Sequence, residues 1–307
     1  MTCVFTPRRT NNGLPKVIFS LKISELSSID SAAESSLAFR MASAEVISLS
    51  IINVFLSVFG CVMNILVVLA IQLNPELQKG LNLLIVSLTV ADLVNCLIAQ
   101  PMYVYYLSNK GDTNYLAALH IVAFIGLHAV FSNLITITYH RMKALSRPLS
   151  HLLLVSQRDL LVFITITWIV SIIVGIVFAT EPGEEAGAYV HGVMILLLIL
   201  TYLRMLWVSR RKRAKIAQEA GTANYHQQAA TMEHENAAAI TSAILVGTTL
   251  LCYLPDVLLD FMGKGEETRL MGTYTLLFSS SALNPCIVIW RNQLFRRALL
   301  QTLRLRD

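Results

Sequence analysis

A small set of polar side chains interrupts long apolar stretches of this sequence, and these side chains are where chemistry is expected. A polar or charged group taken out of water costs free energy unless it is paired, so such residues mark functional or structural sites. Asp92 lies in the middle of one apolar stretch and Arg141 near the end of another, while Asp256 and Asp260 lie four residues apart in a third. The other residues that stand out in these apolar stretches, including two prolines, are Asn64, Trp168, Pro255, Ser280, Ser281, Asn284 and Pro285.

The stretches that carry these residues are long enough to cross a membrane. The chain has 307 residues, of which 55% are apolar and only 14% charged, whereas soluble domains are about a quarter charged. A helix needs about 20 mainly apolar residues to cross the hydrocarbon core. Seven stretches meet that length: residues 46–73, 81–107, 115–139, 160–179, 188–208, 237–262 and 270–290.

After the seventh stretch, residues 291–306 place Leu, Phe and Ala on one helical face and Arg on the other, which predicts an amphipathic helix on an anionic membrane surface. The fold class predicted is therefore an all-α membrane protein, a seven-transmembrane helix bundle with a short amphipathic eighth helix. We expect a disordered extracellular N-terminal tail over 1–44, the seven-transmembrane domain over 45–291, and an amphipathic cytoplasmic helix and tail over 292–307.

Basic residues are segregated to one side of these spans. They include the run at 210–213 and the arginines that follow the seventh span, whereas the opposite loops carry few Lys or Arg and several acids. The positive-inside rule then places the C-terminus in the cytosol and the N-terminus outside. The high apolar content and this segregation argue against nucleic-acid binding.

Short motifs occur in the spans in an informative order. The first span has Asn64, the second has Asp92, and the third ends with Arg141, followed by Pro148 and Leu149. Later positions are Trp168, Tyr202, Cys252-Tyr253-Leu254-Pro255 and Asn284-Pro285. With these motifs, residues 46–303 resemble the rhodopsin-like (class A) G-protein-coupled receptors.

The sequence departs from that family's pattern at several positions. His140 replaces the usual acid before Arg141, Tyr253 replaces a tryptophan, and Val288 replaces a tyrosine. Leu116 stands at a common cysteine position and Met194 at a common proline position of the fifth span. The last two departures and a short second outer loop give a weak resemblance to the melanocortin, adenosine, cannabinoid and lysophospholipid receptors.

The resemblance implies a plasma-membrane receptor, not an enzyme, that binds an extracellular ligand and activates a heterotrimeric G protein by outward movement of the sixth span. Kinks at Pro255 and Pro285 would permit such movement, and an Arg141–Glu235 ion pair would hold the closed state. The alternatives are static kinks and a solvated Glu235. The residues assigned to coupling and switching are His140, Arg141, Glu235, Pro148, Leu149, Tyr202, Tyr253, Pro255, Asn284 and Pro285.

The resemblance also implies a ligand site between the outer halves of the spans. Asp256 and Asp260 share one helical face, and carboxylates with aromatic walls suit a cationic amine or peptide. The ligand-binding residues predicted are Asp256, Asp260, Tyr103, Tyr106, Phe124, His128, Tyr274 and Phe278, with His120 nearby. Ala123 and Phe278 replace the amine-binding carboxylate and the retinal-binding lysine of other subfamilies. The alternative is that the aspartates face water and the aromatic residues only pack the bundle.

Asn64 and Asn284 can each hydrogen-bond to Asp92, so Asn64, Asp92 and Ser281 are expected to form a polar core joining spans one, two and seven. The family often binds sodium there. Gly126 and Val130 offer no side-chain oxygen on the third span, so we expect at most a weak sodium site at Asp92, with a neutral or water-bridged aspartate as the alternative. No other cofactor is expected.

Other function classes find little support. The seven histidines are dispersed, and none shares one span with an acid at metal-ligand spacing, which argues against an intramembrane hydrolase. The sequence has no internal repeat of the kind that many transporters contain, which argues against a transporter. A receptor-like protein that does not signal remains an alternative, because His140, Tyr253 and Val288 all replace switch residues.

Overall fold

The computed structural model describes the backbone of residues 18–304 apart from 76, 79, 81, 110–112, 147–155, 179–180, 219–224 and 264–270. Side chains are described within 43–300, with further gaps at 113, 181–186, 188, 225–232, 234–235, 260–261 and 294. The chain divides into two units, residues 1–48 and 49–307. Pro148 and Leu149, and the side chains of Glu235 and Asp260, lie outside the described residues.

Every described element is a helix. The order is α1 (Ile18–Leu73), α2 (Asn82–Val94), η1 (Asn95–Ala99), α3 (Gln100–Ser108), α4 (Thr113–Ser146), α6 (Gln157–Phe178), α7 (Glu181–Gln218), α8 (Tyr225–Phe261), α10 (Tyr274–Arg291) and α11 (Gln293–Arg304). The π-helical turn η1 joins α2 and α3 into one span. Six described helical segments are long and apolar enough to cross a membrane, and α10 adds an 18-residue helix at the place of the predicted seventh span.

Two boundaries, the starts of α1 and α7, differ from the sequence-based expectation. Helix α1 begins at Ile18, inside the segment expected to be a disordered tail; residues 18–44 contain no Gly or Pro, so nothing in them ends a helix. The basic segment between the fifth and sixth spans, expected to be partly helical, contains the end of α7 and the start of α8, because its Ala, Gln, Lys and Arg residues favour helix. Helix α7 also includes residues 181–186, which we expected to be a loop.

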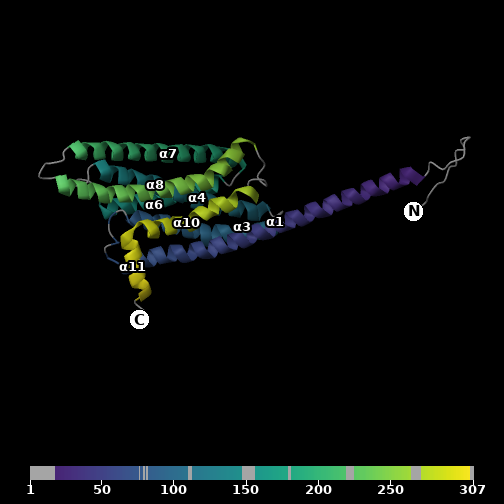
Figure 1. Ribbon diagram of the computed structural model, residues 1–307, viewed down its shortest axis with the longest axis horizontal. Coiled ribbons are helices and arrows are strands. Elements are labelled where there is room, and N and C mark those ends of the chain that lie inside the picture. Colours follow the sequence, from purple (N-terminus) through teal and green to yellow (C-terminus); the bar gives the residue numbers. More distant parts are fainter. Residues whose placement is uncertain are drawn as a thin grey trace, which may run out of the picture. The chain divides into compact units, whose positions relative to one another are not determined.

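Within residues 49–307, α4 packs against α2, η1, α3, α6, α7 and α8, so it lies at the centre of the bundle (Figure 1). Helix α10 packs against α2, η1 and α8, and α11 turns away from the direction of α10. The outer face of α6 exposes large apolar side chains, among them Phe163, Ile166 and Ile173. Such a face is stable only against lipid or another apolar surface.

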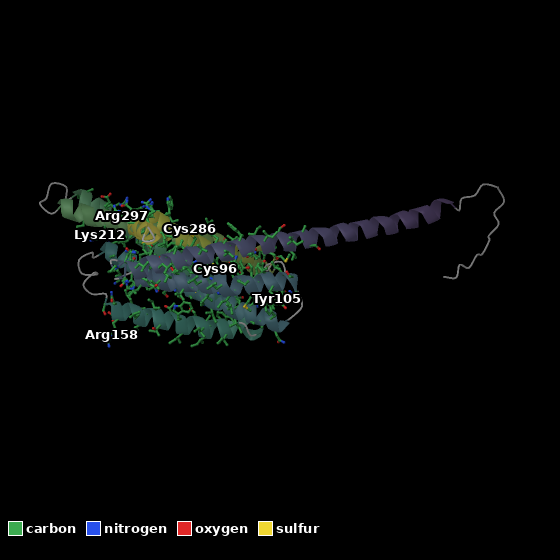
Figure 2. The ribbon with its side chains drawn as sticks, turned by 90° about the horizontal axis from the view of Figure 1, so that it is seen from below. Cys96, Tyr105, Arg158, Lys212, Cys286 and Arg297 are labelled. Atoms are coloured by element: carbon green, nitrogen blue, oxygen red, sulfur yellow. The ribbon has the colours of Figure 1, made fainter. Side chains whose placement is uncertain are left out.

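The two ends of the bundle differ in charge. Figure 2 shows Arg158, Lys212 and Arg297 at one end and Tyr105 at the other. Within α11, Phe295 and Ala298 are buried whereas Arg296 and Arg297 are exposed, as the predicted amphipathic pattern requires.

Candidate ligand site and transmembrane switch

The polar core is built around Asp92, whose side chain is 1% exposed. The Asn284 amide donates to both carboxylate oxygens of Asp92, each at 3.2 Å. The Ser281 hydroxyl lies within hydrogen-bonding reach of the same carboxylate. The structure therefore joins the second and seventh spans through Asp92.

Asn64 takes a different role from a direct bond to Asp92. Its amide donates to the Gly60 carbonyl at 2.9 Å and to the Ser281 carbonyl at 3.0 Å. Pro285 lies four residues after Ser281 and has no N–H, so the Ser281 carbonyl lacks its normal helical donor. Asn64 supplies that donor and fixes the first span to the kinked part of α10.

Asn95 belongs to this core, and the sequence analysis missed it. Its amide donates to the Ser281 hydroxyl at 3.0 Å, and a Cβ on Gly126 would collide with its side chain. The absence of a side chain at Gly126 thus makes room for Asn95 against α4. The signal available in the sequence was a polar residue three positions after Asp92, which places it on the same helical face.

Sodium fits this core only partly. Asp92 and Ser281 are suitable oxygen donors, and the side-chain oxygens of Asn64 and Asn284 are buried with no hydrogen-bond partner among the described atoms. However, Asn95 fills the place beside Gly126. A weakly held ion at Asp92 therefore stays a prediction, and a water bonded to the same oxygens remains its alternative.

A second polar group lies nearer the outer end of the same spans. Asn53 donates to the Thr275 hydroxyl at 2.8 Å, and Gln100 donates to the Asn53 side-chain oxygen at 3.0 Å. Asn53 and Gln100 are both fully buried. These bonds join α1, α3 and α10 and stiffen the wall behind the aromatic residues described next.

Aromatic and imidazole rings form a connected array through the outer half of the bundle. Tyr103 of α3 contacts Tyr274 and Phe278 of α10, with ring centroids 5.8 and 5.7 Å apart. Tyr274 contacts His120 of α4 at 6.4 Å, and His120 contacts Phe124 at 5.8 Å. The structure thus brings together predicted ligand residues from three spans.

The array continues to α6 and α7. Phe124 contacts His191 at 5.5 Å and Phe178 at 6.5 Å, and His128 contacts the same two rings at 4.9 and 5.8 Å. Phe178 and His191 were not among the predicted site residues. Their membership depends on how α6 and α7 pack on α4, which residue spacing within one span does not show.

Asp256 lies at the edge of this array. Its Oδ1 accepts a hydrogen bond of 2.6 Å from the Thr273 hydroxyl, and Thr273 precedes Tyr274. Asp256 is half-buried. The carboxylate is thus tied to the start of α10, beside the residue that begins the ring array.

Tyr106, another predicted ligand residue, is half-buried. The ring of its neighbour Tyr105 contacts that of Tyr115, with centroids 4.7 Å apart and ring planes inclined by 49°. Asp260 begins the part of α8 whose side chains are not described.

The inner half of the bundle is held by packing among α4, α7 and α8. Met142 and Leu145 of α4, Met205 of α7 and Ala239 of α8 form a buried cluster, with Tyr202 packed against it. The Ser209 hydroxyl of α7 donates to the Asn236 side-chain oxygen of α8 at 2.7 Å. The inner end of the sixth span is therefore held by α4 through apolar contact and by α7 through a hydrogen bond.

Three other residues that the sequence analysis assigned to switching lie in different surroundings. Tyr253 is buried and contacts Phe131 of α4 edge-on at 5.0 Å. His140 is buried and its ring contacts Phe163 of α6 at 6.3 Å. Arg141 is half-buried on the next position of α4. The predicted Arg141–Glu235 pair lies outside the described side chains.

These features define a helical membrane protein whose central third span supports a polar core, an outer ring array and a closed inner end. Residues 63–287 match the model of the family described as 7 transmembrane receptor (rhodopsin family). The chain belongs to this family of seven-transmembrane receptors, as its motifs predicted.

Individual relatives agree with that membership. The histamine H2 receptor of Cavia porcellus is 25% identical over 289 residues, covering 82% of this chain and 78% of that receptor. The adenosine receptor A2b of Gallus gallus is 23% identical over 301 residues, covering 81% and 85%. The relatives are receptors, which confirms the prediction that this chain is not an enzyme.

The crystal structure of squid rhodopsin shares the fold. It superposes with a TM-score of 0.73 at 16% sequence identity, covering 85% of this chain and 86% of that one. The predicted seven-helix bundle is thereby confirmed.

Proposed function

We propose that this receptor binds a small cationic ligand among the outer halves of its helices and activates a heterotrimeric G protein. The ring array with Asp256 at its edge is the observation that carries this proposal. A carboxylate attracts an ammonium group, and aromatic faces stabilise a cation further. The names of the relatives, which refer to histamine, adenosine and adrenergic receptors, favour an amine or a nucleoside.

Asp256 couples ligand binding to helix movement in this proposal. It follows Pro255, which lies inside α8 and cannot donate the backbone hydrogen bond of its position. A cation that pairs with Asp256 competes with Thr273 for the carboxylate and changes how the outer end of α8 is held against α10. Because the helix lacks that hydrogen bond at this point, its inner part can change direction.

At the inner end, activation requires α8 to leave α4 and α7. The cluster of Met142, Leu145, Met205 and Ala239 and the Ser209–Asn236 bond must then open. Opening exposes the inner end of α4, where Arg141 lies, to a cytosolic protein. Outward movement of the sixth span is the simplest change that meets this requirement.

The test is nucleotide exchange on a panel of G proteins with the receptor reconstituted in vesicles. Exchange is measured first without ligand and then with libraries of amines, nucleosides and peptides. Ligand-dependent exchange that is lost in Arg141→Ala supports the proposal. Saturable ligand binding with no exchange on any G protein contradicts it and favours a receptor-like protein that does not signal.

A further inference from the structure

The rings of His128 of α4 and His191 of α7 are in contact between two spans, although the sequence places them 63 positions apart. Their ring centroids are 4.9 Å apart and the ring planes are inclined by 55°. The side chains are 2% and 7% exposed. No sequence motif links them, and the polar core and the inner switch use neither.

The surroundings of His128 call for a partner. Neither of its ring nitrogens makes a hydrogen bond of standard geometry to a described residue, although the Phe124 carbonyl one turn earlier lies within electrostatic reach. Buried imidazole nitrogens are normally bonded. The neighbouring rings of Phe124 and Phe178 offer no lone pair.

The spacing of the two histidines suits a shared metal ion. A zinc–imidazole bond is about 2.0–2.1 Å long, so a tetrahedral ion bound by one nitrogen of each ring places the centroids about 5 Å apart. Histidine ligands usually donate their other ring N–H to a carbonyl or carboxylate. The Phe124 carbonyl is in a position to accept that bond from His128.

We propose that His128 and His191 form a two-histidine site for a divalent transition-metal ion, Zn²⁺ or Cu²⁺. Imidazole is a preferred ligand of both ions. The described side chains hold no group of three or more metal-ligating residues, so water or a bound small molecule completes the coordination. A site with two protein ligands is weaker than a four-ligand structural site, and its ion is exchangeable.

The proposal goes beyond receptor signalling and does not depend on it. The ion would bridge α4 and α7 beside Phe124, in the outer half of the bundle. It would therefore restrain these two spans against each other whether or not a G protein couples.

The experiment uses the full chain in nanodiscs of neutral lipid, titrated with Zn²⁺ in competition with a fluorescent zinc chelator. His128→Asn and His191→Asn are each expected to weaken binding at least tenfold. Zinc that still binds to the variant with both substitutions is bound by other residues. The matched control is His120→Asn, because His120 is also buried on α4 but lies about 12 Å further along the helix.

We expect a saturable site in the wild type and in His120→Asn that is lost in the other variants. Zinc binding equal in the wild type and the double variant would overturn the proposal. So would equal losses in all three single variants.

A second measurement keeps the test valid if a variant does not fold. Cu²⁺ added to the wild type at one equivalent is examined by electron paramagnetic resonance, and two coordinated imidazole nitrogens are expected. A spectrum of copper with no coordinated nitrogen would exclude the site without any substitution.

Discussion

The carboxylate of Asp256 accepts a hydrogen bond from Thr273 and lies one residue beyond Pro255. At the scale of single residues, this places a charge at the point where the sixth span lacks a backbone hydrogen-bond donor. The rings of the array that begins at Tyr274, next to Thr273, come from five other spans. If Asp256 contacts the ligand as proposed, it should be sensitive even to a substitution that preserves its size.

Asp256→Asn is expected to weaken a cationic agonist about ten- to a hundredfold. The variant keeps the shape of the side chain but removes a charge-assisted hydrogen bond, which contributes about 1.5–3 kcal/mol. Asp260→Asn is expected to act in the same direction. Affinity is measured by competition binding on purified receptor.

Asp159→Asn is the control, because Asp159 is an exposed acid in the first turn of α6, away from the ring array. Unchanged affinity in both Asp256→Asn and Asp260→Asn would place the ligand elsewhere or show that it carries no positive charge.

At the scale of elements, α10 is shaped by a missing donor. Pro285 leaves the Ser281 carbonyl without its helical N–H, and the side chain of Asn64 supplies a substitute at 3.0 Å. The kink in one span is thus stabilised by a side chain of another. A double-mutant cycle of Asn64 and Pro285 should therefore show an interaction energy whose sign can be predicted.

Asn64→Leu is expected to reduce the free energy of unfolding by about 1–3 kcal/mol, because it leaves the buried Ser281 carbonyl unsatisfied. In a Pro285→Ala background the loss should be smaller, since the backbone N–H of the introduced alanine can bond to that carbonyl. Thermal unfolding in detergent measures both. Equal losses in the two backgrounds would show that Asn64 does not compensate for the proline.

The inner ends of α7 and α8 provide a second test at this scale. Ser209→Ala and Asn236→Ala each remove the 2.7 Å bond between these helices. A hydrogen bond of about 0.5–1.5 kcal/mol holds the closed state, so the active population should rise up to about tenfold. Ligand-free nucleotide exchange at matched receptor density reports this change.

Ser108→Ala serves as the control for that measurement, since it removes an exposed hydroxyl bond near the opposite end of the bundle. If Ser209→Ala and Asn236→Ala leave ligand-free exchange at the level of this control, the bond does not hold the resting state.

At the scale of the whole molecule, the segregated charge predicts the orientation in the membrane. Arg158, Lys212 and Arg297 gather at one end of the bundle. We expect a tag at the N-terminus to be labelled on intact cells and a tag after Asp307 only after permeabilisation. Labelling in the reverse pattern would contradict the proposed receptor orientation.

The balance between resting and active bundles is also a property of the whole molecule. An acid at position 140 could restrain Arg141 by charge, whereas His140 packs its ring against Phe163. We therefore expect measurable ligand-free exchange in the wild type. His140→Asp should lower it, Glu235→Ala should raise it by removing the predicted partner of Arg141, and Arg141→Ala should abolish it.

These rates are compared in vesicles at equal receptor density. A silent wild type with no change in any of the three variants would mean that this switch does not operate.

The sequence by itself determined the class of fold, because each span must be a continuous run of apolar residues to satisfy its backbone inside a membrane. Asp92, Asn284 and Pro285 were recognised for the same reason, since polar residues and prolines are conspicuous in such runs. The amphipathic pattern of α11 was equally readable. These signals are local, because each lies within a single helix and does not depend on how that helix packs against its neighbours.

The tertiary structure decided which residues from different spans meet. Asn95 became part of the polar core because Gly126 of another helix leaves it room, and Asn64 bonded to Ser281 rather than to Asp92. His191 and Phe178 joined the ring array only through the packing of α6 and α7 on α4. Rotation and depth of one helix against another depend on side-chain packing over the whole contact, which no periodicity within a single span records.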